Sequence, residues 1–190
     1  MRRISALEQK IRHYVNDPNL YDTHFKNDVD QWNALCVAMD TLGDSCLALG
    51  HYEASGIGDD YGEKYLKLYG LLQAVFLQQD SIRQLHRTFL ENELQADPDS
   101  AWVGIRELRN LTVGHPIEKR IKAGTKRCFI SRISISSDRF KLIVCNKDDD
   151  RDEFEDVDFK HLYESYKSEA IQHLEKVHQA QHSKWGSLED

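Results

Sequence analysis

The sequence predicts a mainly α-helical bundle with a small antiparallel β-hairpin just before a C-terminal helix. Apolar residues recur every three or four positions along three long segments, which is the spacing of a helix that packs one face into a core. Alternating β-branched residues are confined to two short runs between about residues 126 and 146, and these predict the hairpin. A chain of 190 residues can bury one sizeable core, so we expect a single domain over residues 1–190.

The first third of the chain predicts two helices. Residues 3–15 form an amphipathic segment that should end near Asp17-Pro18. A long helix is expected over about residues 23–50, followed by a glycine-rich connection over residues 51–62. The apolar seam of the long helix consists of Phe25, Val29, Trp32, Cys36, Met39, Leu42, Cys46 and Leu49. This seam predicts core packing and not a cofactor site.

A second long helix is expected over about residues 61–95, and its apolar face becomes polar along its length. In its second half the core-facing arc and its edge hold Gln79, Asp80, Arg83, His86 and Arg87. These side chains predict a hydrogen-bonding cluster beside the core. The alternative is that the cations are exposed or form weak surface ion pairs with nearby glutamates.

A shorter helix is expected to begin after Asp97-Pro98, with Asp97 or Asp99 as its N-cap. At ~100° per residue, Arg109 falls in the same arc as the core residue Trp102. An unpartnered buried guanidinium is costly, so Arg109 should meet a carboxylate, a carbonyl cluster or a phosphate in a partly wetted cleft.

This shorter helix is expected to end at Gly114-His115-Pro116. Gly114 suits a left-handed position after the helix, and Pro116 cannot continue a helix. A reversal at Gly114 would return the His115 imidazole toward Arg109 and so build a site. The alternative is that these residues are only a helix C-cap and that Arg109 extends to solvent.

At these residues the chain resembles the HEPN superfamily, whose signature is an arginine, usually followed by a polar residue, and then a histidine after a gap of four to six positions. Here Arg109-Asn110 precedes His115, with five residues between Arg109 and His115. The resemblance covers about residues 22–116 in architecture and only residues 109–115 in motif. It implies a HEPN-like helical bundle, often a homodimer, in which Arg and His of both subunits line a cleft and many members cleave RNA without a metal.

The resemblance also implies a role for each polar residue of this region. In HEPN proteins a polar or acidic residue of the preceding long helix often supports the motif, and here Gln79 or Asp80 is the candidate. We expect Asp80 to hold Arg109 because a bidentate carboxylate best offsets a desolvated guanidinium. Arg109 is expected to bind the scissile phosphate, His115 to transfer a proton and Asn110 to orient the site. The expected substrate-binding residues are Arg106, Arg83, Lys119 and Arg120.

The predicted function is a metal-independent endoribonuclease that acts on structured RNA, with no metal and no cofactor. The alternative is a non-catalytic HEPN-like dimeric binding module of a toxin–antitoxin or defence system, with a cognate antitoxin or a nucleotidyltransferase as its partner. Convergence of both copies of Arg109 and His115 on one open cleft would favour the enzyme.

A cation cluster and an acidic run accompany the predicted hairpin. The cations can steer a phosphate backbone, although a solvated loop is their commoner meaning; they are Lys119, Arg120, Lys122, Lys126, Arg127 and Arg132. The acidic run, residues 147–158, is expected to be a solvated loop because it lacks the spacing of a calcium-binding EF-hand. Asp156 or Asp158 should then cap a C-terminal helix over about residues 158–182.

Charge and cysteine content predict which partners and which cellular compartment suit this chain. The net charge of −7 predicts no general attraction to nucleic acid or to anionic membranes, so any RNA binding must be local. No apolar run approaches the ~20 residues of a membrane span, and the start lacks a signal-peptide core, which predicts a cytoplasmic protein. The four cysteines lack zinc-site spacing, so we expect reduced thiols, even if Cys128 and Cys145 lie opposite each other in the hairpin.

Overall fold

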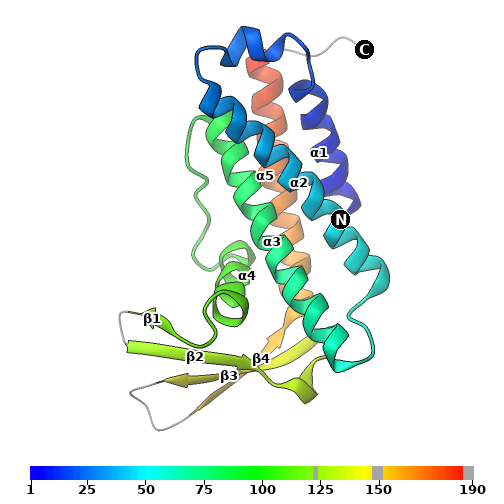
Figure 1. The fold of residues 1–190 in the computed structure, drawn as a ribbon, viewed down its shortest axis with the longest axis vertical. Helices are drawn as coiled ribbons and strands as arrows, with labels where there is room; N and C mark the ends of the chain where they lie inside the picture. The colour runs from blue at the N-terminus through cyan, green and yellow to red at the C-terminus, as the bar shows by residue number, and fades with distance from the viewer. Residues whose placement is uncertain (122–123, 147–151, 186–190) are drawn as a thin grey trace.

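The computed structural model describes residues 1–121, 124–146 and 152–185. Its long helices run side by side as a bundle, and a small antiparallel sheet lies at one end of that bundle, next to the shorter helix α4 (Figure 1). The helices are α1 (Arg2–Val15), α2 (Val29–Ser55), α3 (Tyr61–Leu90), α4 (Ala101–Arg109) and α5 (Phe159–Trp185). The strands are β1 (Lys119–Ile121), β2 (Gly124–Ile130), β3 (Arg139–Asn146) and β4 (Glu153–Asp158). The predicted mainly α-helical architecture, with a small antiparallel sheet before the C-terminal helix, is confirmed.

Three predicted helix boundaries are wrong by several residues. α2 continues to Ser55 and so includes the first part of the connection predicted over residues 51–62. α2 begins at Val29 and not near residue 23, because the Asp28 side chain accepts a hydrogen bond from Gln31 N (3.0 Å) and caps the helix there. α3 ends at Leu90 and not near residue 95, because Glu91 adopts a left-handed conformation with a φ of 56°. None of the helices in the described part of the chain combines the length and the apolar character that a bilayer crossing requires.

The core of the bundle contains a short chain of buried polar groups. The Tyr166 hydroxyl of α5 donates a hydrogen bond to Gln78 Oε1 of α3 (2.8 Å), and Gln78 Nε2 donates to Ser45 Oγ of α2 (3.2 Å). All three residues are buried, and the ring of Tyr166 packs against the fully buried Trp102 of α4. Because buried polar groups need partners, these contacts favour one alignment of α2, α3 and α5.

The four strands form one antiparallel sheet in the order β1-β2-β3-β4. β2 and β3 correspond to the predicted hairpin, whereas β1 and β4 lie in segments for which no strand was predicted. The inner face of the sheet is buried in the core through Cys128, Ile130, Phe140, Leu142 and Val144. β4 is almost entirely exposed and rich in acidic residues, which suits an edge strand because charge discourages pairing with other chains.

The described part of the acidic run is therefore a strand, and the expectation of a solvated loop is wrong there. Strand pairing with β3 supplies the hydrogen bonds that a loop would take from water. Asp158 accepts a hydrogen bond from His161 N (3.0 Å) at the start of α5, in agreement with the predicted cap. Residues 147–151 of the acidic run, and Lys122 of the cation cluster, lie outside the described residues.

The two cysteines of the sheet do not lie opposite each other. Cys128 pairs with Val144 and Cys145 pairs with Arg127, so the cysteine side chains point to opposite faces of the sheet. Both are free thiols, and burial raises the pKa of Cys128 to about 11. Cys128 is therefore a small core residue.

Two hydrogen bonds attach β2 to the helical part of the chain. The Tyr65 hydroxyl of α3 donates to the Ile130 carbonyl (2.9 Å), and Cys128 N donates to the Pro116 carbonyl (2.8 Å). The second bond places β2 beside the segment that follows α4, which is the segment that carries the candidate site.

Candidate functional site

The start of α4 is held against α5. Ser100 is the N-cap and accepts a hydrogen bond from Val103 N (3.3 Å). The prediction that Asp97 or Asp99 is the cap is wrong, because Asp97 accepts from Asp99 N (2.9 Å) in the preceding turn. Glu169 of α5 accepts from the first two backbone N–H groups of α4 at 3.0 and 2.7 Å. This carboxylate satisfies helix donors that would otherwise be unpaired and fixes the position of α4.

The end of α4 is a π-helical turn, Asn110–Gly114. His115 N closes it by donating to the Asn110 carbonyl (2.8 Å), and the buried Thr112 hydroxyl donates to the Leu108 carbonyl (2.7 Å). π-helical turns insert an extra residue into a helical path and are frequent at functional sites. Here the turn separates Arg109 from His115 without a left-handed residue.

At Gly114 the close approach of the Arg109 side chain, and not the backbone angle, favours glycine, because a side chain here would displace the guanidinium. Gly56 and Gly58 are the glycines with positive φ in the described part of the chain, so the predicted left-handed conformation of Gly114 is wrong. A β-carbon at this position would lie 2.7 Å from Arg109 Nη1. The predicted reversal would have returned the His115 imidazole toward Arg109, but His115 is exposed and it is Gly114 that lies next to the guanidinium.

Arg109 is held by neutral groups. Its Nε and Nη2 donate to Gln73 Oε1 (3.0 and 2.8 Å), and its Nη1 donates to Asn110 Oδ1 (3.1 Å). Its guanidinium carbon lies 4.1 Å from the centre of the Phe76 ring, within the range of a cation–π contact. The predicted pairing of Arg109 with Asp80 is wrong. The half-buried guanidinium is thus oriented by two amide oxygens and one aromatic ring, and no carboxylate of the described residues neutralises it.

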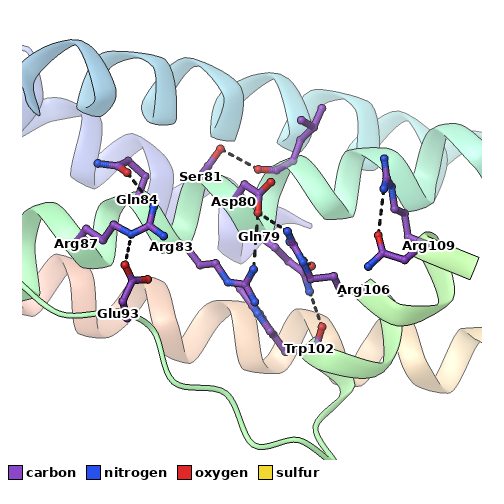
Figure 2. A network of polar contacts seen from close by, with 12 residues as sticks. Gln79, Asp80, Ser81, Arg83, Gln84, Arg87, Glu93, Trp102, Arg106 and Arg109 are labelled. Atoms are coloured by element: carbon purple, nitrogen blue, oxygen red, sulfur yellow. Dashed lines mark hydrogen bonds and ion pairs between the residues drawn. The ribbon is translucent and has the colours of Figure 1, made fainter. Parts of the chain in front are cut away.

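Asp80 belongs instead to a neighbouring cluster centred on Arg106. Arg106 Nη2 lies 2.8 Å from Asp80 Oδ1, and Arg106 Nη1 donates to Gln79 Oε1 (3.3 Å). The buried Gln79 donates in turn to the Trp102 carbonyl (2.7 Å), and Arg83 Nη1 lies 3.8 Å from the same Asp80 oxygen. Figure 2 shows Arg106 and Arg83 converging on Asp80, with Arg109 apart from them.

The direction of α4 relative to α3 explains this division of partners. Going from Arg106 to Arg109 along α4, the partner on α3 moves back from Asp80 to Gln73, so the two helices run antiparallel here. Arg106 and Arg83 therefore share the Asp80 carboxylate, whereas Arg109 has neutral partners. Burial, and next the charge of Arg106, lower the pKa of Arg83, as a local excess of cations requires. The cluster is electropositive although the whole chain is acidic.

The other predicted site residues lie beyond the π-helical turn. His115 is exposed, and no hydrogen bond joins its side chain to Arg109 or to another residue that the structure describes. Lys119 opens β1, and the exposed Arg120 pairs with Glu118 (3.3 Å). The structure therefore brings Arg109, Asn110 and the backbone at 114–115 together, while Lys119 and Arg120 extend along the edge of the sheet.

Two functional candidates, Gln73 and Phe76, were missed by sequence reasoning. They share one face of α3 with Asp80, at spacings of three and four residues, and this spacing is the signal that identifies them. His86 was predicted to join the same polar cluster as Asp80 and Arg83, and this prediction is wrong. His86 is buried against His173 of α5, with ring centres 5.4 Å apart.

Within the described ranges, no three His, Cys, Asp or Glu side chains lie close enough together to hold a metal ion. In comparisons with known proteins, no family model, no curated protein and no solved structure matches this chain.

Proposed function

We propose that this chain is a metal-independent endoribonuclease of the HEPN type that acts on structured RNA. The observation that carries the proposal is the state of Arg109: it is preorganised by Gln73 and Asn110, but both acceptors are neutral. A cation held in place without a counter-charge is suited to bind a phosphate and to stabilise the charge that develops on it. Arg106, by contrast, already has a carboxylate partner in Asp80.

In the proposed reaction His115 accepts the proton of an RNA 2′-hydroxyl. The 2′-oxygen forms a bond to phosphorus, the bond from phosphorus to the 5′-oxygen breaks, and the leaving oxygen takes up a proton. Imidazole is the usual proton-transfer group near neutral pH. The exposure of His115 leaves its ring accessible to a bound strand, and the π-helical turn keeps it within one residue of the backbone that touches Arg109.

The test is incubation of the purified protein with total tRNA in the presence of EDTA. We expect discrete fragments that end in a 2′,3′-cyclic phosphate, and no cleavage of DNA, because DNA lacks the 2′-hydroxyl. Cleavage that needs an added divalent metal would contradict the Arg109–His115 reaction. The absence of products over a broad RNA panel would favour a non-catalytic binding module.

The nuclease proposal includes a homodimer that covers the outer surface of α2 and α3. A hollow of about 450 Å³ lies there, lined by Val37, Leu77 and the arginine partner Asp80. Val37 is 65% exposed and Leu77 40%, an apolar surface that a second copy would bury. Because Asp80 borders both the hollow and the arginine cluster, such a dimer would bring two Arg109 sites toward one cleft.

Light scattering is expected to show a dimer at micromolar concentration, and Val37→Asp is expected to shift it to a monomer because the interface would then bury an unpaired charge. Leu47→Asp is the matched control, since Leu47 is also exposed on α2 but lines a different hollow. A monomeric wild-type protein would contradict the proposal that two Arg109 sites form one cleft.

A further inference from the structure

The outer face of the sheet carries a row of apolar side chains that the core does not use. Phe129 of β2 pairs with Ile143 of β3, and Ile143 pairs with Phe154 of β4, so the three side chains lie in one line across three strands. Phe129 is 53% exposed and Phe154 68%. The opposite face of the same strands is the one packed into the bundle, so this row contributes little to the stability of the fold.

Cations lie on both sides of the row. Arg127 precedes Phe129 by two residues and Lys141 precedes Ile143 by two, and in antiparallel strands these positions fall on opposite sides of the row and on the same face. The exposed Arg127 forms no ion pair within the ranges that the structure describes. Lys141 lies 3.7 Å from Asp156 in an exposed pair that a phosphate can displace at little cost.

The size of the row decides which kind of partner fits it. A fully covered phenylalanine buries about 150–250 Å², and both rings are already partly covered. The row therefore offers well under the roughly 800 Å² per partner of a stable protein–protein interface. A stacked nucleobase needs only one ring face. Sheet surfaces with exposed aromatic side chains and neighbouring cations are a recurrent way to bind unpaired bases.

We propose that the outer face of the sheet binds single-stranded nucleic acid, with unpaired bases stacked on Phe129 and Phe154 and backbone phosphates near Arg127 and Lys141. β4 is acidic along its length, at Glu153, Glu155, Asp156 and Asp158, so the backbone of the nucleic acid lies toward the β1–β2 side and only a base reaches Phe154. The proposal does not depend on cleavage at Arg109. It does place the bound strand close to the π-helical turn, because Cys128, the neighbour of Phe129, is hydrogen-bonded to the residue that follows His115.

The experiment is fluorescence anisotropy in EDTA with a labelled oligouridine of about 12 nucleotides, the matching oligothymidine and an RNA duplex of the same length. The protein carries His115→Ala so that cleavage cannot affect binding. Phe129→Ala and Phe154→Ala are each expected to weaken single-strand binding roughly tenfold, with Phe129→Trp at or above the starting affinity. Leu66→Ala is the matched control, because Leu66 is 74% exposed on α3, and it should bind normally.

Binding of both the oligouridine and the oligothymidine would show that the protein recognises the bases. Binding of the oligouridine alone would show that it also recognises the 2′-hydroxyl. Either result supports the proposal if the two phenylalanine variants bind more weakly than their parent. The proposal is overturned if no single strand binds, if both phenylalanine variants bind like their parent, or if the duplex binds as tightly as the single strands. Conversion of a dimer to a monomer by Phe129→Ala would also overturn it, since a second copy would then cover the row. Absence of RNA cleavage by the wild-type protein, with intact oligonucleotide binding, would count only against the nuclease proposal.

Discussion

His115→Ala is expected to lower the rate of RNA cleavage by at least ~100-fold, because removal of a general acid–base group costs about 10²–10⁴ in rate. RNA affinity should change little, since phosphate contacts come from Arg109 and from the cations of the sheet. Single-turnover cleavage of one tRNA by excess enzyme measures the chemical step, and anisotropy with the same RNA measures binding. A His115→Ala protein that cleaves like the wild type would show either that His115 is not the proton acceptor or that the activity is a contaminant.

Arg109→Ala is expected to abolish cleavage and also to weaken binding, because one side chain provides both the phosphate contact and the charge stabilisation. Arg106→Ala is the matched control: Arg106 contacts the same Phe76 ring at 3.9 Å but is paired with Asp80. Removal of Arg106 leaves the buried Gln79 Oε1 without its donor and should affect thermal stability more than cleavage. If Arg109→Ala is the more destabilising change and Arg106→Ala the more inactivating one, the roles assigned to the two arginines are reversed.

Helix seams could be predicted from the sequence because each seam is a local pattern of three- and four-residue steps. β1 and β4 could not, because Lys119-Arg120 and the acidic residues of 153–158 have the composition of loops. Their strand conformation depends on pairing with the neighbouring strands β2 and β3, and the composition of β1 and β4 alone does not show this pairing. Charge is tolerated there because both strands lie at the edges of the sheet.

The position of Arg109 in the arc of Trp102 could be predicted from helical geometry, and the structure leaves that arginine half-buried. Its partner could not be predicted, because an interhelical contact depends on how far α4 slides along α3. A shift of about two turns along α3 exchanges Asp80 for Gln73. The role of Gly114 could not be predicted for a similar reason: the atom that a β-carbon would displace belongs to the Arg109 side chain, five residues earlier.

The protein is expected to lose stability on mild acidification, through a pair of histidines between α3 and α5, the buried His86 and the half-buried His173. His173 lies with its ring centre 4.9 Å from that of Trp102 and 5.4 Å from that of His86. His173 Nδ1, His86 Nε2 and Trp102 Nε1 are buried without a hydrogen-bond partner among the residues described. Burial, then the neighbouring His86 and Lys176, lower the pKa of His173 to about 4, and burial also lowers the pKa of His86.

The sign of the effect follows from the protons that each state binds. Between the ordinary histidine pKa near 6.5 and the folded value near 4, the unfolded chain binds a proton that folded His173 does not, so stability falls as pH drops through this window. For His173 alone the loss at about pH 5 is about 2 kcal/mol. Carboxylates lose their contribution to stability at lower pH. Burial raises the pKa of Glu53, but ion pairs with the N-terminus and Lys167 outweigh burial and lower this pKa below the ordinary value of 4.5. The stability that Glu53 contributes is therefore lost only as pH falls below that value.

Urea unfolding at about pH 7 and about pH 5 measures the loss. His173→Phe keeps an aromatic ring against Trp102 but cannot titrate, so its free energy of unfolding should change much less between the two pH values. His161→Phe is the control, because His161 is exposed on the same helix and should leave the wild-type pH dependence intact. If His173→Phe loses as much stability as the wild type, other groups cause the acid sensitivity. If the wild type loses no stability above pH 5, the protonated histidines are hydrogen-bonded in the folded protein.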